Sequence, residues 1–267
     1  MDYIQAILLA LIQGLTEFLP VSSSAHLILP AQLLGWPDQG LAFDVAVHTG
    51  TLIAVIVYYR ASLQSLLFAT LGRGDALVER RREVVCLALA TLPAVAVGVL
   101  FADMIDGVLR GIPVIASTTL LFGVLLGLSY AYRAPGIDEQ PITRLDHAIL
   151  IGLAQAFALI PGTSRSGVTM TAALFLGYNI ASAARFSFLL SIPVIAGALL
   201  LMLVREWGAL FASSSVLLTV SAMLIAALSA YVTIAFFVSL VARVGMMPFV
   251  IYRIFLAMVL FLIVVFV

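Results

Sequence analysis

The sequence has no lysine, a single cysteine and few charged residues of any kind. Of its 267 residues only 10% are charged, whereas 64% are apolar and the mean hydropathy is +1.22. A chain with so little polar surface cannot face water on all sides, so we expect lipid to be its solvent. The 13 acidic residues balance the 13 basic residues, which gives no reason to expect a nucleic-acid partner.

The lone cysteine argues against a disulfide or a cysteine metal site, and the N-terminal segment argues against a secretory signal. Cys86 lies in an apolar run, and by itself it forms neither an intrachain disulfide nor a thiolate metal site. The first twenty residues lack the basic start and cleavage pattern of a secretory signal, and they contain Gln13 and Glu17. We therefore expect the N-terminal segment to belong to the mature protein.

Six apolar stretches are long enough, at roughly 18 to 25 residues, to cross a hydrocarbon core of about 30 Å as helices. They cover residues 41–60, 84–101, 113–132, 183–204, 216–241 and 247–267. Two further apolar segments, 3–35 and 146–177, are interrupted in the middle. The interruptions are Pro20-Val21-Ser22-Ser23-Ser24 and Pro161-Gly162-Thr163-Ser164-Arg165-Ser166.

Each interrupted segment predicts a helix, a break and a second helix, with the first pair at about 3–19 and 22–34. Because each half is short for a crossing, we expect two re-entrant hairpins. Non-helical backbone at membrane depth is tolerated only where protein or a water-filled cavity satisfies its polar groups. Both breaks should therefore face the interior of the helix bundle.

The two breaks also resemble each other. Their alignment pairs Pro20 with Pro161, Ser22 with Thr163 and Ser23 with Ser164, with Gln13 and Gln155 preceding them. Two repeats, at about 1–135 and 142–267, then hold one hairpin and three spans each, and three crossings invert the second repeat. We predict an all-α integral membrane protein forming a single domain, an inverted-topology repeat of six transmembrane helices and two re-entrant hairpins.

The arginines of the short loops predict the orientation of these spans. The predicted loops 61–83 and 133–145 are arginine-rich, whereas loops 102–112 and 205–215 hold one arginine each, so the rich loops are cytoplasmic. The arginines on the rich side are Arg60, Arg73, Arg80, Arg81, Arg82, Arg133, Arg144 and Arg243. Both termini then lie outside, the first hairpin enters from the outer face, and the second enters from the cytoplasm.

The first break gathers groups that can carry chemistry. Gln13 and Glu17 are four residues apart on one helix face, and Ser23 and His26 follow across the break. An ionisable group inside a span costs about 2.5–3.5 kcal/mol on insertion scales and by default marks a functional site. Two structural alternatives stay open: Glu17 as an interfacial carboxylate near a helix end, and Ser22 as a helix N-cap.

The second break predicts an anion site. It opens a helix whose first-turn N–H groups are free, and it adds the Arg165 guanidinium and the hydroxyls of Ser164, Ser166 and Thr169. A structural ion pair between Arg165 and Glu17 is the alternative. A phosphate or diphosphate matches the planar fork of donors better.

Three residues outside the breaks are further candidates. Asp44 and His48 lie four apart at the start of the 41–60 span, either as a pair behind the site or as an entrance pair. Arg185 either helps to bind the phosphate or snorkels toward the cytoplasmic face.

With these residues in view, the chain resembles the undecaprenyl-diphosphate phosphatase family associated with bacitracin resistance, over essentially its full length. The segments Gln13 to His26 and Pro161 to Thr169 carry the resemblance. The chain departs from the common family pattern at Gln13, where glutamate also occurs, at Ser24-Ala25 and at Asp44. Because Gln13 is uncharged, Glu17 should carry most of the carboxylate chemistry.

The resemblance implies hydrolysis of undecaprenyl diphosphate to the monophosphate, which recycles the carrier lipid for cell-wall peptidoglycan synthesis. It places the chain in the bacterial inner membrane, with an active site open to the periplasmic side and a divalent cation, Mg²⁺ or Ca²⁺. The expected partners are this polyprenyl diphosphate and membrane lipid. The oligomeric state, a homodimer included, is left open.

The residues and the resemblance together suggest a division of roles. Glu17 with Gln13 would hold the cation, and Arg165 with Ser164, Ser166 and Thr169 would bind the terminal phosphoryl group. Ser23 would be the nucleophile or position a water. His26 would be its base or the acid for the leaving group, with a phosphohistidine as a rival. The alternative function is a transporter or flippase for a phosphorylated polyprenyl lipid, because inverted repeats with broken helices are a transporter plan.

Overall fold

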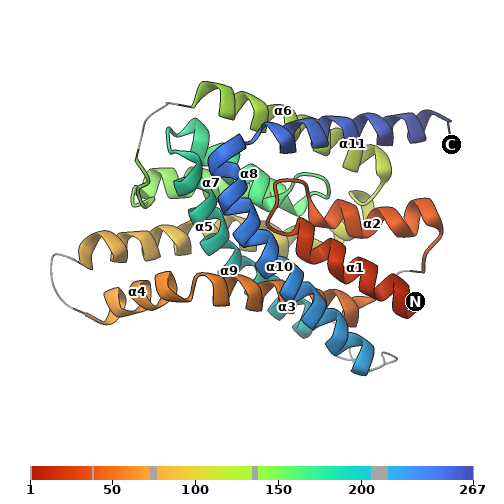
Figure 1. Ribbon diagram of the computed structural model, residues 1–267, viewed down its shortest axis with the longest axis horizontal. Helices are drawn as coiled ribbons and strands as arrows, with labels where there is room; N and C mark the ends of the chain where they lie inside the picture. Colours follow the sequence, from red (N-terminus) through yellow and green to blue (C-terminus); the bar gives the residue numbers. More distant parts are fainter. Residues whose placement is uncertain (1, 38, 73–76, 134–137, 206–215, 267) are drawn as a thin grey trace.

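The computed structural model describes residues 2–37, 39–72, 77–133, 138–205 and 216–266, and the elements in these ranges are helices (Figure 1). They are α1 Tyr3–Thr16, α2 Ser23–Leu34, α3 Leu41–Tyr58, α4 Arg60–Leu71, α5 Val78–Val108, α6 Ile112–Tyr132, α7 Leu145–Ala156, the short 3-10 turn η2 Phe157–Leu159, α8 Arg165–Phe175, α9 Ile180–Arg205, α10 Val216–Val244 and α11 Met247–Phe266.

The predicted spans are confirmed as apolar helices. Helices α5, α6, α9, α10 and α11 each contain a stretch long and apolar enough to cross a membrane, and α3 with α4 forms a sixth candidate bent by 74°. The chain is therefore an integral membrane protein with several membrane-spanning helices.

The predicted loop at 61–83 was wrong, because most of its described part is helical. Helix α4 occupies Arg60–Leu71, and α5 already begins at Val78 with Arg80, Arg81 and Arg82 in its first turns. Charged residues near the end of an apolar run mark the end of a span but do not end a helix. Arg73 lies outside the described residues.

Both predicted helix breaks are present. Helix α1 ends at Thr16 and α2 begins at Ser23, and in the second half η2 ends at Leu159 and α8 begins at Arg165. Ser22 and Ser164 interrupt the helix at the two breaks, because they are the non-glycine residues with positive φ in the described chain, at 77° and 70°. Each is the N-cap of the helix that follows. Such a backbone cannot continue a helix.

This backbone geometry corrects the register of the alignment between the breaks. Ser22 is the conformational counterpart of Ser164, not of Thr163. The two positive-φ serines are separated by the same number of residues as Gln13 and Gln155. The serine pair and the glutamine pair are therefore related by the same offset along the sequence.

The backbone of each break is hydrogen-bonded by a side chain of the other broken segment, and the backbone of the second break is also bonded by α6. Gly162 N–H donates to Ser22 Oγ over 3.2 Å, and Ser166 Oγ donates to the carbonyl oxygen of Leu19 over 2.8 Å. From α6, Thr118 Oγ1 donates to the Pro161 carbonyl oxygen over 2.6 Å. These bonds satisfy non-helical polar groups without water, as membrane depth requires.

The helices pack around these breaks in a regular pattern. Helix α10 packs against α1 and α3, α5 packs against α7 and α9, and α6 lies beside α11 (Figure 1). The largest apolar core joins Phe18 and Val21 of the first break and residues of α7 and α8 to α9 and α10, with the rings of Phe18 and Phe188 edge to face at 5.4 Å. This core holds the two broken segments together at the centre of the bundle.

Candidate active site

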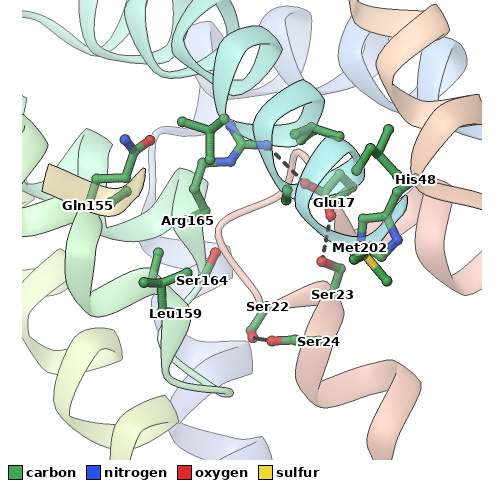
Figure 2. Close-up of a pocket in the computed structure, with 16 residues that line it drawn as sticks. Glu17, Ser22, Ser23, Ser24, His48, Gln155, Leu159, Ser164, Arg165 and Met202 are labelled. Atoms are coloured by element: carbon green, nitrogen blue, oxygen red, sulfur yellow. Dashed lines mark hydrogen bonds and ion pairs between the residues drawn. The ribbon is translucent and has the colours of Figure 1, made fainter. Parts of the chain in front are cut away.

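A polar cavity of about 190 Å³ lies where the two breaks meet (Figure 2). Its remaining walls are apolar and come from η2, α5 and α9. The polar residues that line it are Glu17, Ser22, Ser23, Ser24, His48, Gln155, Ser164 and Arg165. A polar cavity enclosed by apolar helices fits a ligand with a compact polar head.

Glu17 is the centre of this polar cluster. Arg165 Nη2 donates to Glu17 Oε1 over 3.0 Å, while Ser23 Oγ and Gln13 Nε2 donate to Oε2 over 2.6 and 3.0 Å. Both ionic side chains are largely buried, with 8% of Glu17 and 11% of Arg165 exposed. The two broken segments therefore bring the acidic and guanidinium groups together, in the direct ion pair that the sequence left open as the structural alternative.

Arg165 is held by more than its carboxylate partner. Its Nη1 donates to the carbonyl oxygen of Ser187 in α9 over 3.0 Å, and its guanidinium carbon lies 5.7 Å from the ring centre of Phe18. Removing a charge from water is expensive unless the charge is paired and hydrogen-bonded. These contacts fix the guanidinium at the cavity wall.

Two helix N-termini meet at the cavity. Helix α2 begins with Ser23 and α8 begins with Arg165, so the positive ends of both helix dipoles lie at this site. Ser164 Oγ accepts from the N–H of Gly167, as an N-cap does. Two helix starts and a guanidinium at one cavity are the expected surroundings for a phosphate.

Arg253 of α11 is a site residue that the sequence analysis missed. Its side chain is completely buried, and it donates only to carbonyl oxygens: Pro20 over 3.1 Å, Gly162 over 2.9 Å, Thr163 over 3.0 Å and Thr119 over 3.3 Å. The guanidinium therefore joins both breaks to α6.

The sequence carried a signal for this residue. Arg253 lies well inside the last apolar span, where an arginine is as unfavourable as Glu17 is in the first hairpin. Glu17 and Arg253 share this property: each is an ionisable residue inside an apolar segment.

Ser166 and Thr169 do not line the cavity. Ser166 Oγ donates to Leu19 O, and Thr169 Oγ1 donates to the Arg165 carbonyl over 2.8 Å and lies 2.7 Å from Ser187 Oγ. Their hydroxyls satisfy polar groups of the protein, so the direct phosphate contact expected for them has no support in this geometry. Ser164 does line the cavity.

His26 bonds groups other than Ser23, so its expected role as the base for that hydroxyl has no support in this geometry. One ring nitrogen, Nδ1, lies 2.7 Å from the Ser22 carbonyl oxygen, and Nε2 lies 2.5 Å from Tyr252 Oη. His26 lines a different, apolar cavity beside Tyr252.

The three candidates outside the breaks differ in whether they line the cavity. His48 lines the cavity, and its Nδ1 bonds the Asp44 carbonyl oxygen over 2.8 Å, whereas the Asp44 carboxylate accepts from Gln39 over 3.1 Å. Arg185 forms an ion pair with the buried Glu83 of α5. Arg185 therefore neither snorkels nor reaches the cavity.

Buried polar atoms without a partner lie at the cavity or on residues next to those that line it. In the described ranges, the buried side-chain atoms without a hydrogen-bond partner are Gln13 Oε1, Gln155 Oε1 and Thr163 Oγ1. Across those ranges, no group of three His, Cys, Asp or Glu side chains forms a metal cluster. A cation at this site would therefore depend on Glu17 together with amide and hydroxyl oxygens.

We expect Arg253→Met to lower the apparent free energy of unfolding by about 3 kcal/mol or more, because four buried carbonyl groups lose their donor. The measurement is thermal unfolding of the purified protein in detergent. The matched control is Arg243→Met, at an exposed position near the end of α10, which should unfold like the wild type. Equal stability of the two variants would contradict the assigned role of Arg253.

Comparison with known proteins gives an independent result. Residues 6–259 match the family described as bacitracin resistance protein BacA. A protein of Alcanivorax borkumensis named undecaprenyl-diphosphatase is 55% identical over 271 residues, which cover 96% of this chain and 97% of the relative. Relatives with the same name are 52% identical in Teredinibacter turnerae, over 98% of this chain and 99% of the relative, and 48% identical in Saccharophagus degradans, over 96% of each.

Proposed function

The chain belongs to the bacitracin resistance protein BacA family, and we propose that it hydrolyses undecaprenyl diphosphate to undecaprenyl phosphate and phosphate. Its relatives over nearly the full length are named undecaprenyl-diphosphatase, which confirms the resemblance drawn from the two motifs. The reaction returns the carrier lipid to peptidoglycan synthesis.

The observation that carries the proposal is the Glu17–Arg165 pair at two converging helix N-termini. In the structure Glu17 accepts a hydrogen bond from the guanidinium. A diphosphate offers Arg165 more negative charge than one carboxylate does, so substrate binding draws Arg165 onto the terminal phosphoryl group. Arg165 and the start of α8 then stabilise the charge that develops on that group in the transition state.

Release of Arg165 leaves Glu17 bonded to Ser23, whose hydroxyl already donates to Glu17 Oε2 over 2.6 Å. We assign Ser23 as the nucleophile and Glu17 as its base. A bond forms between Ser23 Oγ and the terminal phosphorus, the bond from that phosphorus to the bridging oxygen breaks, and the proton passes to Glu17. The electron pair leaves with undecaprenyl phosphate, and water then hydrolyses the phosphoserine.

A divalent cation fits the oxygen donors of the site. Gln13 Oε1 is buried and unpartnered, and Nε2 of the same amide donates to Glu17 Oε2. Turning this amide over would place its carbonyl oxygen beside the carboxylate oxygens of Glu17. Mg²⁺ and Ca²⁺ prefer such ligands. Bound there, a cation would neutralise part of the diphosphate charge.

We also propose that the two halves form an inverted repeat. The packing of α1 on α10 corresponds to that of α7 on α5, and the packing of α3 on α10 corresponds to that of α9 on α5. The shared spacing of the positive-φ serines and of the two glutamines with an unpartnered Oε1 supports the same plan. In this plan each broken segment is a re-entrant hairpin.

The arginine distribution supports a site that is open to the outer side of a bacterial inner membrane. With the arginine-rich segments cytoplasmic, α3 begins outside, whereas α5 and α9 end outside. The cavity-lining residues of these helices lie in their outer halves: His48 in α3, Ala94 in α5 and Val194 to Met202 in α9.

The decisive test of the function is phosphate release from undecaprenyl diphosphate by the purified protein in detergent. We expect release that stops with EDTA and returns when Mg²⁺ or Ca²⁺ is added in excess. Translocation of the lipid without phosphate release would favour the transporter alternative and contradict hydrolysis. Undiminished phosphate release in EDTA would show that hydrolysis does not require a cation, and it would still support the hydrolase.

Arg165→Ala should reduce kcat/KM by about a thousandfold, because the main stabiliser of transition-state charge is lost. The control is Arg60→Ala, an exposed arginine remote from the cavity, which should keep wild-type rates. Thermal unfolding in detergent shows whether both variants are folded. Near-normal turnover by folded Arg165→Ala would refute the assignment.

Ser23 and His26 make different predictions about the phosphorylated intermediate. Rapid acid quenching after mixing with substrate labelled in the terminal phosphate should trap an acid-stable phosphoserine, absent from Ser23→Ala and present in the control Ser117→Ala on α6. Acid-labile label on His26 would show that the imidazole is the nucleophile. Turnover by Ser23→Ala at the wild-type rate would assign the attack to water.

A further inference from the structure

An apolar cavity of about 200 Å³ continues from the polar cavity between α5 and α9. The two cavities share five lining residues, of which Figure 2 labels Leu159 and Met202. The shared residues are Ala94, Leu159, Val194, Ala198 and Met202.

The lining changes character completely across this boundary. Beyond it the wall has no polar side chain: it consists of alanine, glycine, valine, leucine, isoleucine and methionine. On the α5 side, Val95 and Val99 are 41% and 58% exposed, so the cavity opens sideways to the surface that faces lipid in the bilayer. A ligand that fills both cavities has a polyanionic head and a hydrocarbon chain.

We infer that this apolar cavity, the tail groove, binds the isoprene units next to the diphosphate of the substrate. The inference rests on the proposed function. The diphosphate lies at Glu17 and Arg165, and the chain leaves between α5 and α9, with its far end in the surrounding lipid. Removal of the first isoprene units from water contributes to affinity in proportion to the apolar area they bury.

A larger apolar cavity, of about 360 Å³, lies beside His26 and Tyr252. Its lining comes from α1, the first break, α2, α10 and α11, and none of these residues lines the polar cavity. A chain attached to a diphosphate at Arg165 has to leave through a wall that borders Arg165. Continuity therefore favours the tail groove over the larger cavity.

Two glycines give the tail groove its width. A Cβ atom built at Gly98 would meet only the Leu159 side chain, at 3.8 Å, and one at Gly197 would meet only Val95, at 3.9 Å. A Cβ at either position meets no backbone within 4 Å, and because both glycines line the groove, a larger side chain there extends into it. Leucine is also a better helix former than glycine, so the substitutions do not weaken the helices.

The experiment compares Gly98→Leu and Gly197→Leu with Gly107→Leu, which lies on α5 in open space. Two quantities are measured for each full-length protein in detergent: the KM for farnesyl diphosphate, and the inhibition constant of inorganic diphosphate, which has no tail. We expect both groove variants to raise the KM at least tenfold and to keep the inhibition constant within twofold of the wild type. Gly107→Leu should leave both quantities unchanged.

Two results would overturn the assignment. One is an unchanged KM in both groove variants. The other is inhibition by inorganic diphosphate that weakens in parallel with the KM, because the substitutions would then act through the phosphate cavity.

Crosslinking tests the tail groove without catalysis. A farnesyl diphosphate analogue with a benzophenone on its first isoprene unit should label peptides of α5 and α9, and labelling around Phe249 and Tyr252 would place the chain in the larger cavity instead. If the wild type releases no phosphate from any diphosphate, the proposed function fails, whereas the crosslinked peptides still locate the chain.

Discussion

The fold depends on how the carbonyl groups of two broken helices are satisfied away from water. Arg253 does most of this: its guanidinium bonds carbonyl oxygens of Pro20 in the first break, of Gly162 and Thr163 in the second, and of Thr119 in α6. Carbonyl dipoles in turn stabilise its buried charge. The contact fixes the two breaks relative to each other, and with them the two helix N-termini that form the site.

The parts of the structure that follow from local sequence signals could be predicted. Long apolar runs gave the spans, and proline, glycine and serine in the middle of an apolar segment gave the breaks within a few residues. The meeting of Glu17 with Arg165 also followed, because a charge at membrane depth needs a partner and each hairpin supplied one of opposite sign. The family was visible in the same two segments.

Two kinds of feature could not be predicted: the direction of individual side chains, and contacts made by residues near the C-terminus. Spacing placed His26 near Ser23 but did not show that the imidazole turns back to the Ser22 carbonyl and to Tyr252. Motif composition suggested phosphate contacts for Ser166 and Thr169, whose hydroxyls instead bond within the protein. Arg253 is more than 200 residues from the first break, and only the tertiary structure brings them together.

The interlocking of the breaks has an evolutionary consequence. Ser22 accepts from Gly162 and Ser166 donates to Leu19, so each half completes the main-chain hydrogen bonding of the other. If the halves form the inverted repeat proposed above and descend from a duplicated gene, the ancestral half-length protein could bury its own kinked segment only by associating with a second copy inserted in the opposite orientation. Dual-topology insertion would then have preceded the duplication, and fusion would have allowed Glu17 and Arg165 to diverge into different chemical roles.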